Sequence, residues 1–331
     1  MNDSHKRPNI LDNMHPIETG TYIIPTNEID RLYQKISQCL INRSPGAIIY
    51  GRPRLGKTRA IKYLQTILPL EFEEISTYFI MCRRYKNPNE NTFFEDVLTG
   101  VGHALPHNGK ACHKRERLFK FLIEEAVIKK SNRIVFFIDD AQRLSEIQYD
   151  WLMDINNELD NYGISFTVFL FGQNELVHQR SVFVELGKHQ IIGRFMVQHH
   201  QFNGVSKKND LKECLNGCDE NCEFPAGSNY SFTRYYFPNQ FKEGFRLSNF
   251  SDELYSAFKE LRSESGIKEK IEIPMQYITL TVDYALKEFG IDGQNLYQID
   301  LENWREAIIS SGYIEAELYG NIQMKLSSKK N

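Results

Sequence analysis

Residues 51–58 have the types and spacing of a phosphate-binding loop. Glycines at both ends of such a P-loop let several backbone N–H groups converge on phosphates at the positive end of the following helix. Lys57 would reach the outer phosphates, and the Thr58 hydroxyl would bind Mg²⁺. The predicted nucleotide-binding residues are Gly51, Arg52, Pro53, Arg54, Leu55, Gly56, Lys57, Thr58 and Arg59. A surface turn rich in glycine and basic residues is the alternative.

The flanks of this loop favour the nucleotide-binding interpretation. Residues 47–50 are apolar and suit a buried strand, and residues 59–68 carry apolar side chains at helical spacing. Strand, glycine loop and helix therefore occur in the order that a P-loop requires.

A second acidic motif follows another apolar run. Residues 133–138 suit a buried strand, and Asp139 and Asp140 come at its end. Asp139 would hold Mg²⁺ through water, and Asp140 would activate the attacking water. Since Asp140 is one methylene shorter than glutamate, we expect slow turnover. The alternative is a solvated strand end.

Two further polar positions suit a hydrolytic site. Gln173 ends the next predicted strand and is the first choice to sense the γ-phosphate, with Asn174 second, although Asn174 also suits a helix N-cap. Arg194 precedes the last predicted strand and could reach the nucleotide of a neighbouring subunit, with Arg180 as the competing candidate. An ordinary surface salt bridge would also explain either arginine.

The element pattern predicts an α/β fold with a parallel sheet flanked by helices. Strands are expected at 75–82, 133–139, 164–171 and 195–200, and helices separate them. Helical periodicity returns at 252–264, 275–289 and 301–311. The predicted organisation is an N-terminal extension at 1–46, a core at 47–203, an irregular linker at 204–248, a helical domain at 249–318 and a mobile tail at 319–331.

The motifs together resemble the AAA+ ATPases, and the exact residue sequence of several motifs resembles that of TnsC-type transposition regulators, relatives of TniB and MuB. The residues that carry the AAA+ likeness are 51–58, 135–140, 172–174 and 193–195. The TnsC likeness is carried by 138–142 and 193–195, with the softer stretches 245–247 and 274–277. The resemblance implies an AAA+ core with a five-stranded parallel sheet, a smaller C-terminal helical domain, and ATP with Mg²⁺ as cofactors. Asp140 departs from the commoner Asp-Glu pair.

The same resemblance implies partners. In that family, ATP drives subunits into homo-oligomeric rings or filaments on double-stranded DNA, which link a target-selector protein to the transposase subunits. Hydrolysis then disassembles the polymer. A helicase loader or another AAA+ DNA remodeller is the nearest alternative, and a signalling NTPase without DNA is the second. The tail after Gly320 is a candidate transposase contact.

Two basic clusters are the candidate DNA contacts. Arg83, Arg84 and Lys86 follow the second predicted strand, and Lys110 and Lys114 precede a long predicted helix. Such side chains would neutralise phosphates without reading sequence. A solvated helix start and a charged loop are the alternative.

Three cysteines recur at four-residue spacing. Cys214, Cys218 and Cys222 could bind Zn²⁺ through their thiolates, or pack as small apolar residues on one helix face.

Bulk properties exclude little about the partners. The formal net charge of −3 gives no preference for nucleic acid, so any such surface must be local. We expect a cytoplasmic protein without a membrane partner, because the polar residues 1–13 lack a secretory signal and no apolar segment is long enough to span a bilayer.

Overall fold

The structure is a computed structural model that describes residues 7–72 and 75–328, with side chains to residue 320. The chain divides into two compact units, Arg31–Phe202 and a second unit formed by Met1–Asp30 with Asn203–Asn331. Each unit is described by itself. None of the described helices combines the length and the apolar character needed to cross a membrane.

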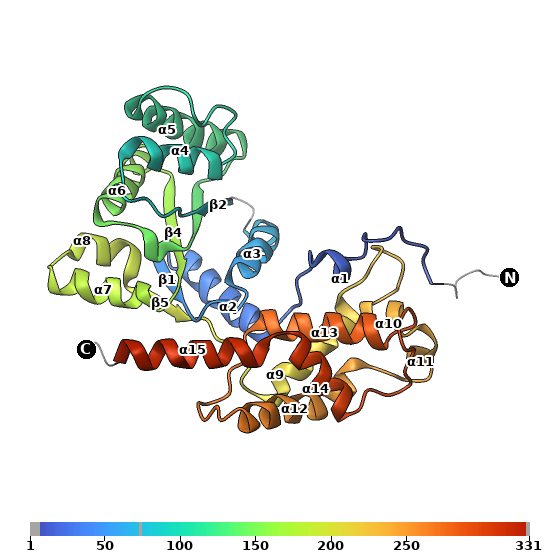
Figure 1. The fold of residues 1–331 in the computed structure, drawn as a ribbon. Helices are drawn as coiled ribbons and strands as arrows, with labels where there is room; N and C mark the ends of the chain where they lie inside the picture. The colour runs from blue at the N-terminus through green and yellow to red at the C-terminus, as the bar shows by residue number, and fades with distance from the viewer. Residues whose placement is uncertain (1–6, 73–74, 329–331) are drawn as a thin grey trace. The chain divides into compact units, whose positions relative to one another are not determined.

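The unit Arg31–Phe202 is built on a five-stranded sheet, which Figure 1 shows with its helices. The strands are β1 (Gly46–Tyr50), β2 (Ile75–Met81), β3 (Arg133–Asp139), β4 (Ser165–Gly172) and β5 (Gln198–Gln201). They lie in the order β2-β3-β4-β1-β5, and every pair is parallel. This confirms the predicted fold class. β5 begins later than expected, because the residues before it form a π-helical turn, η2 (Ile192–Met196).

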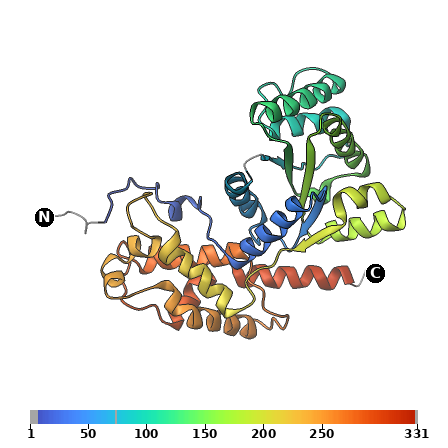
Figure 2. The same ribbon diagram turned by 180° about the vertical axis from the view of Figure 1, so that it is seen from behind.

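Helices cover this sheet. They are α2 (Asn27–Ile41), α3 (Lys57–Glu71), α4 (Glu90–Gly100), α5 (Ala111–Ile128), α6 (Glu146–Asn161), α7 (Glu175–Glu185) and α8 (His189–Ile191). Figures 1 and 2 show α4, α5 and α6 gathered together beside the strands. Their apolar faces share one buried cluster with alternate residues of the sheet, such as Phe136 of β3 and Val168 of β4.

The central strands are apolar on both faces because both faces are buried. In β3, the residues from Ile134 to Asp139 are all buried. Phe136 contacts the helical cluster, whereas Phe137 stacks on Phe169 of β4 with ring centroids 5.6 Å apart. This burial fixes the register of β3 and therefore the place where Asp139 leaves the sheet.

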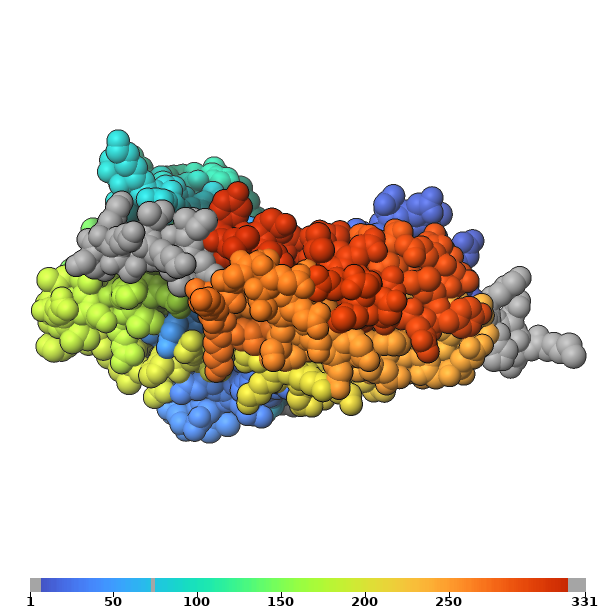
Figure 3. All heavy atoms as spheres, turned by 60° about the horizontal axis from the view of Figure 1, so that its bottom comes forward, coloured from blue at the N-terminus to red at the C-terminus, as the bar shows by residue number. Residues whose placement is uncertain are grey.

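The second unit is helical. Its elements are α1 (Pro16–Thr19), α9 (Lys208–Asn216), η3 (Gly217–Asn221), α10 (Phe232–Tyr236), α11 (Pro238–Lys242), η4 (Leu247–Phe250), α12 (Ser251–Glu264), α13 (Met275–Phe289), α14 (Leu301–Ser310) and α15 (Tyr313–Ser328). Residues of these helices, including the fully buried Phe258 and Trp304, form one core. In Figure 3, the part of this unit coloured orange to red, which includes α12, α13 and α14, forms one continuous surface.

Residues 204–248, expected as an irregular linker, contain short helices that share this core. Buried Asp219 holds them together, since its carboxylate accepts hydrogen bonds from Thr233 Oγ1 at 2.7 Å and from the Leu247 and Ser248 N–H groups at 2.9 and 3.0 Å.

The start of the expected tail lies within α15, which runs to Ser328. Arg262 of α12 pairs with Glu317 at 2.6 Å, with both side chains at most 5% exposed, and so anchors α15. Residues 329–331 lie outside the described residues.

Candidate functional site

The P-loop connects β1 to α3, so it leaves the carboxyl edge of the sheet. Gly51 is required there, because a Cβ at this position would lie 2.2 Å from the carbonyl oxygen of Phe202. Arg54 and Gly56 both adopt positive φ angles, 67° and 100°, which turn the chain sharply into the helix. Lys57 is the first residue of α3, and the N–H groups at the N-terminus of this helix suit an anion.

The Lys57 ammonium lies inside this loop. Its side chain is buried, and Nζ donates hydrogen bonds to the carbonyl oxygens of Gly51 at 2.9 Å and Arg52 at 2.7 Å. A buried cation within a loop of N–H groups is suited to a polyphosphate.

The two motifs predicted to bind the nucleotide and its metal meet in space. Thr58 Oγ1 donates a hydrogen bond to Asp139 Oδ2 at 2.5 Å. Asp139 is 7% exposed, and this burial raises the pKa of its carboxyl, while the bond from Thr58 opposes the rise. A hydroxyl beside a carboxylate supplies the oxygen ligands that Mg²⁺ prefers, so these residues fit the expected metal.

Asp140 lies in the same turn and is held on both carboxylate oxygens. It adopts a left-handed conformation with φ of 55°. Arg143 Nη2 pairs with Oδ2 at 2.9 Å, and Gln142 Nε2 donates to Oδ1 at 3.2 Å. The predictions from sequence gave Gln142 and Arg143 no role, and only their closeness to Asp140 in the chain could have indicated one.

Gln173 follows β4 at the same edge of the sheet. The end of β4 therefore lies beside the turn that follows β3. The backbone N–H of Gln173 donates to Gln142 Oε1 at 3.2 Å. Asn174 occupies the N-cap position of α7 but makes no capping bond through its side chain.

Arg194 lies at the opposite edge of the sheet. It belongs to η2, which precedes β5, and its backbone carbonyl oxygen lies against Gly46 at the start of β1. The five residues of β1 span about 16 Å, so this strand separates Arg194 from the P-loop of its own subunit. Nη1 of Arg194 donates to Asn157 Oδ1 of α6 at 2.9 Å. The competing Arg180 is a residue of α7.

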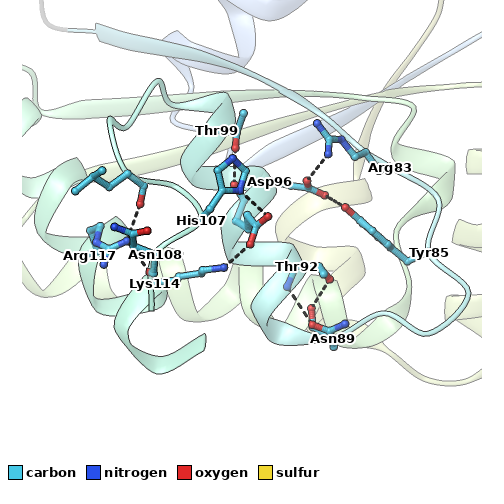
Figure 4. A network of polar contacts seen from close by, with 12 residues as sticks. Arg83, Tyr85, Asn89, Thr92, Asp96, Thr99, His107, Asn108, Lys114 and Arg117 are labelled. Atoms are coloured by element: carbon cyan, nitrogen blue, oxygen red, sulfur yellow. Dashed lines mark hydrogen bonds and ion pairs between the residues drawn. The ribbon is translucent and has the colours of Figure 1, made fainter. Parts of the chain in front are cut away.

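The predicted DNA contacts divide into free and engaged side chains. Arg84, Lys86 and Lys110 are exposed and make no ion pair with any residue in the described part of the chain. The Arg83 side chain is 64% exposed, and its Nη1 lies 3.6 Å from Oδ1 of Asp96 in α4, a contact drawn in Figure 4. These four side chains are available to a phosphate.

Lys114 was wrongly predicted to contact DNA. It is 1% exposed and forms an ion pair with Glu95 of α4, to which His107 also pairs (Figure 4). The side chain points into the α4–α5 contact because Lys114 continues the buried face formed by Leu118 and Leu122.

The predicted zinc site is also wrong. Among the described residues, which include every cysteine, no group of three or more His, Cys, Asp and Glu side chains could hold a metal. Cys214, Cys218 and Cys222 belong to the apolar core of the second unit, where Cys214 Sγ lies 3.9 Å from Met275 Sδ. Burial raises the pKa of Cys214 and of Cys222 to about 12, which disfavours the thiolate that zinc requires.

Comparison with known proteins agrees with this geometry. Residues 42–179 match the family described as AAA domain. The structure of the Aeropyrum pernix ORC2 protein in ADPNP-ADP complexes is similar, with a TM-score of 0.53 and 13% identity over 90% of this chain and 71% of that one. Its ADP form gives 0.54 and 12%, over 88% and 71%. No curated protein matches the sequence. Residues 42–179 therefore match an AAA domain, and the five-stranded parallel sheet with its flanking helices has the AAA+ fold.

Proposed function

We propose that this chain is an ATP-hydrolysing AAA+ protein that assembles on double-stranded DNA. The observation that carries the proposal is the convergence of Lys57, Thr58 and Asp139 at one edge of the sheet, with Thr58 and Asp139 joined at 2.5 Å. The likeness to an ORC2 protein in ADPNP-ADP complexes supports an adenine nucleotide as the ligand.

In this proposal, Lys57 and the N–H groups of residues 51–59 other than Pro53 would bind the triphosphate, and Thr58 and Asp139 would hold Mg²⁺. The metal neutralises charge on the phosphates when bound. Asp140 accepts the proton of the attacking water, and Gln173 orients that water or the γ-phosphate. The Asp140 side chain is one methylene shorter than glutamate, which supports slow turnover in the isolated subunit.

Assembly follows from the position of Arg194. A guanidinium at the amino edge of the sheet is far from its own P-loop, so it acts on the nucleotide of a neighbouring subunit. Val182 of α7, Leu186 at the C-cap of α7 and Val197 beside η2 are about half exposed. Exposed apolar side chains near this arginine support self-association at that face.

The basic loop at residues 83–86 is connected to the nucleotide site. The N–H of Cys82 donates to the Asp139 carbonyl oxygen at 2.9 Å, and Arg143 Nη1 donates to the Cys82 carbonyl oxygen at 3.1 Å. Binding of DNA phosphates to Arg83, Arg84 and Lys86 therefore acts on a loop attached to the Asp139–Asp140 turn. This link favours a DNA-bound function over a signalling NTPase.

The leading role is that of a DNA remodeller or helicase loader, since the similar structures reported above are ORC2 proteins. A transposition regulator is the second candidate, and the observation that favours it is the wording of residues 138–142 and 193–195. Only that candidate includes transposase subunits and a target-selector protein as partners, and the tail after Gly320 as a contact.

Electron microscopy and ATPase assays of the protein, with and without duplex DNA, test the proposal. We expect ATP-dependent rings or filaments on DNA and turnover that disappears in Lys57→Ala. ATP-dependent assembly that is the same with and without DNA would instead indicate the signalling NTPase. Unaltered turnover in Lys57→Ala would refute the nucleotide site. Retention of transposase subunits on the assembled complex would favour the second candidate.

A further inference from the structure

The side chain of Gln142 joins the ends of two neighbouring strands. Its amide Nε2 donates to Asp140 Oδ1 at 3.2 Å, in the turn after β3. Its amide Oε1 accepts from the Gln173 N–H at 3.2 Å, in the loop after β4. One planar amide thus contacts both Asp140 and Gln173, the two residues that act on the attacking water in the proposed hydrolysis.

The strand beside it leaves room for this amide. Gly172, the last residue of β4, has no Cβ, and a Cβ there would lie 2.6 Å from Gln142 Oε1. Real Cβ atoms essentially never approach another heavy atom so closely. The observed position of the Gln142 amide therefore depends on the glycine.

Two side chains, Arg143 and Gln142, restrain the Asp140 carboxylate. The backbone of Asp140 has φ of 55°, a conformation that a non-glycine residue adopts at a cost. Arg143 holds Oδ2, but this ion pair is more than a third exposed on both sides and is therefore weak. Gln142 holds the other oxygen, Oδ1, and its amide also extends to a second loop of the site.

We infer that Gln142 is a positioning residue, which fixes the Asp140 carboxylate relative to Gln173 so that both address the same water. The inference rests on the proposed ATP hydrolysis. Since Gln142 contacts the two water-directing loops and not the P-loop, its loss should lower turnover and leave ATP affinity unchanged.

Steady-state kinetics of two variants test this role. Gln142→Ala removes both hydrogen bonds, and Gln142→Glu keeps an acceptor for the Gln173 N–H but loses the donor to Asp140. We expect kcat to fall about 10- to 100-fold in both, with the KM for ATP unchanged. Gln38→Ala, an exposed glutamine on α2, is the matched control and should retain the parental kcat.

Gly172→Ala gives an independent test that does not alter Gln142 itself. Its Cβ should displace the amide, so that kcat falls as in Gln142→Ala. In the Gln142→Ala background, the nearest side-chain atom left is Leu176 Cδ2 at 3.2 Å, and the same substitution should cost little more. If the double variant instead loses kcat by the product of the two single losses, Gly172 and Gln142 do not act together, and the inference is overturned.

The outcomes separate this inference from the proposed function. If the parent hydrolyses ATP and Lys57→Ala does not, an unchanged kcat in Gln142→Ala overturns the role of Gln142 alone. A raised KM with an unchanged kcat would do the same. If the parent binds ATP but never hydrolyses it, both the function and the inference fall.

Discussion

The salt dependence of DNA binding gives a quantitative test of the basic surface. Arg84, Lys86 and Lys110 are exposed and have no ion-pair partner among the described residues, so each can take one phosphate. Replacing all three with glutamine removes their charges and retains polar side chains. We expect weaker binding to duplex DNA and, above all, a shallower dependence on salt.

The magnitude follows from counterion release. Each phosphate contact contributes about 0.9 to the slope of log K against log salt, so three contacts contribute about 2.7. Raising the salt from about 50 to 200 mM should therefore weaken binding by the parent roughly 40-fold more than binding by the variant.

Fluorescence anisotropy with a labelled duplex of arbitrary sequence, in the presence of a non-hydrolysable ATP analogue, measures this slope. The control variant replaces Arg43, Lys129 and Lys130 with glutamine, which removes the same charge before β1 and β3, at the other edge of the sheet. It should keep the parental slope. An unchanged slope in the Arg84/Lys86/Lys110 variant, or an equal change in the control, would refute the proposed DNA surface.

Three further predictions concern single residues. Lys114→Met should keep the parental salt slope but destabilise the fold by about 2 kcal/mol in urea unfolding, because it removes the buried ammonium that pairs with Glu95. The bond from Lys114 holds the pKa of Glu95 below its usual 4.5, so this loss should shrink as the pH falls below that value, and a constant loss would contradict the pairing. Asp140→Asn should lower kcat about 100-fold or more without changing ATP affinity, whereas parental turnover would remove Asp140 as the base. In thiol labelling of the native protein, Cys112 should react first, since the other cysteines are buried, and elemental analysis should find no stoichiometric zinc.

Much of the fold could be predicted because the spacing of apolar residues along the sequence indicates which residues are buried in strands and helices. Apolar runs marked β3 and β4, and their ends placed Asp139 and Gln173 at one edge of the sheet. The pairing of Thr58 with Asp139 followed from the P-loop and from parallel strands. These features depend on local periodicity and on sheet direction.

The error at Lys114 arose because a charged residue occupies a buried position. Lys114 precedes Leu118 and Leu122 at four-residue spacing, so its place on the buried face was visible in the sequence, although its charge suggested a surface. The role of Gln142 could not be predicted, because it depends on how closely β4 approaches the turn after β3. The π-helical turn before β5 left no clear signal in its residue types.

Subunit mixing tests most directly the central claim, that the ATP site is completed by a second copy of the chain. Lys57→Ala subunits lack a working P-loop but supply Arg194, and Arg194→Ala subunits supply the intact P-loop. Each variant alone should be inactive on DNA. An equal mixture should recover activity, because about a quarter of randomly formed interfaces combine the two intact halves. An inactive mixture of subunits that still assemble, or full activity of Arg194→Ala alone, would contradict the account.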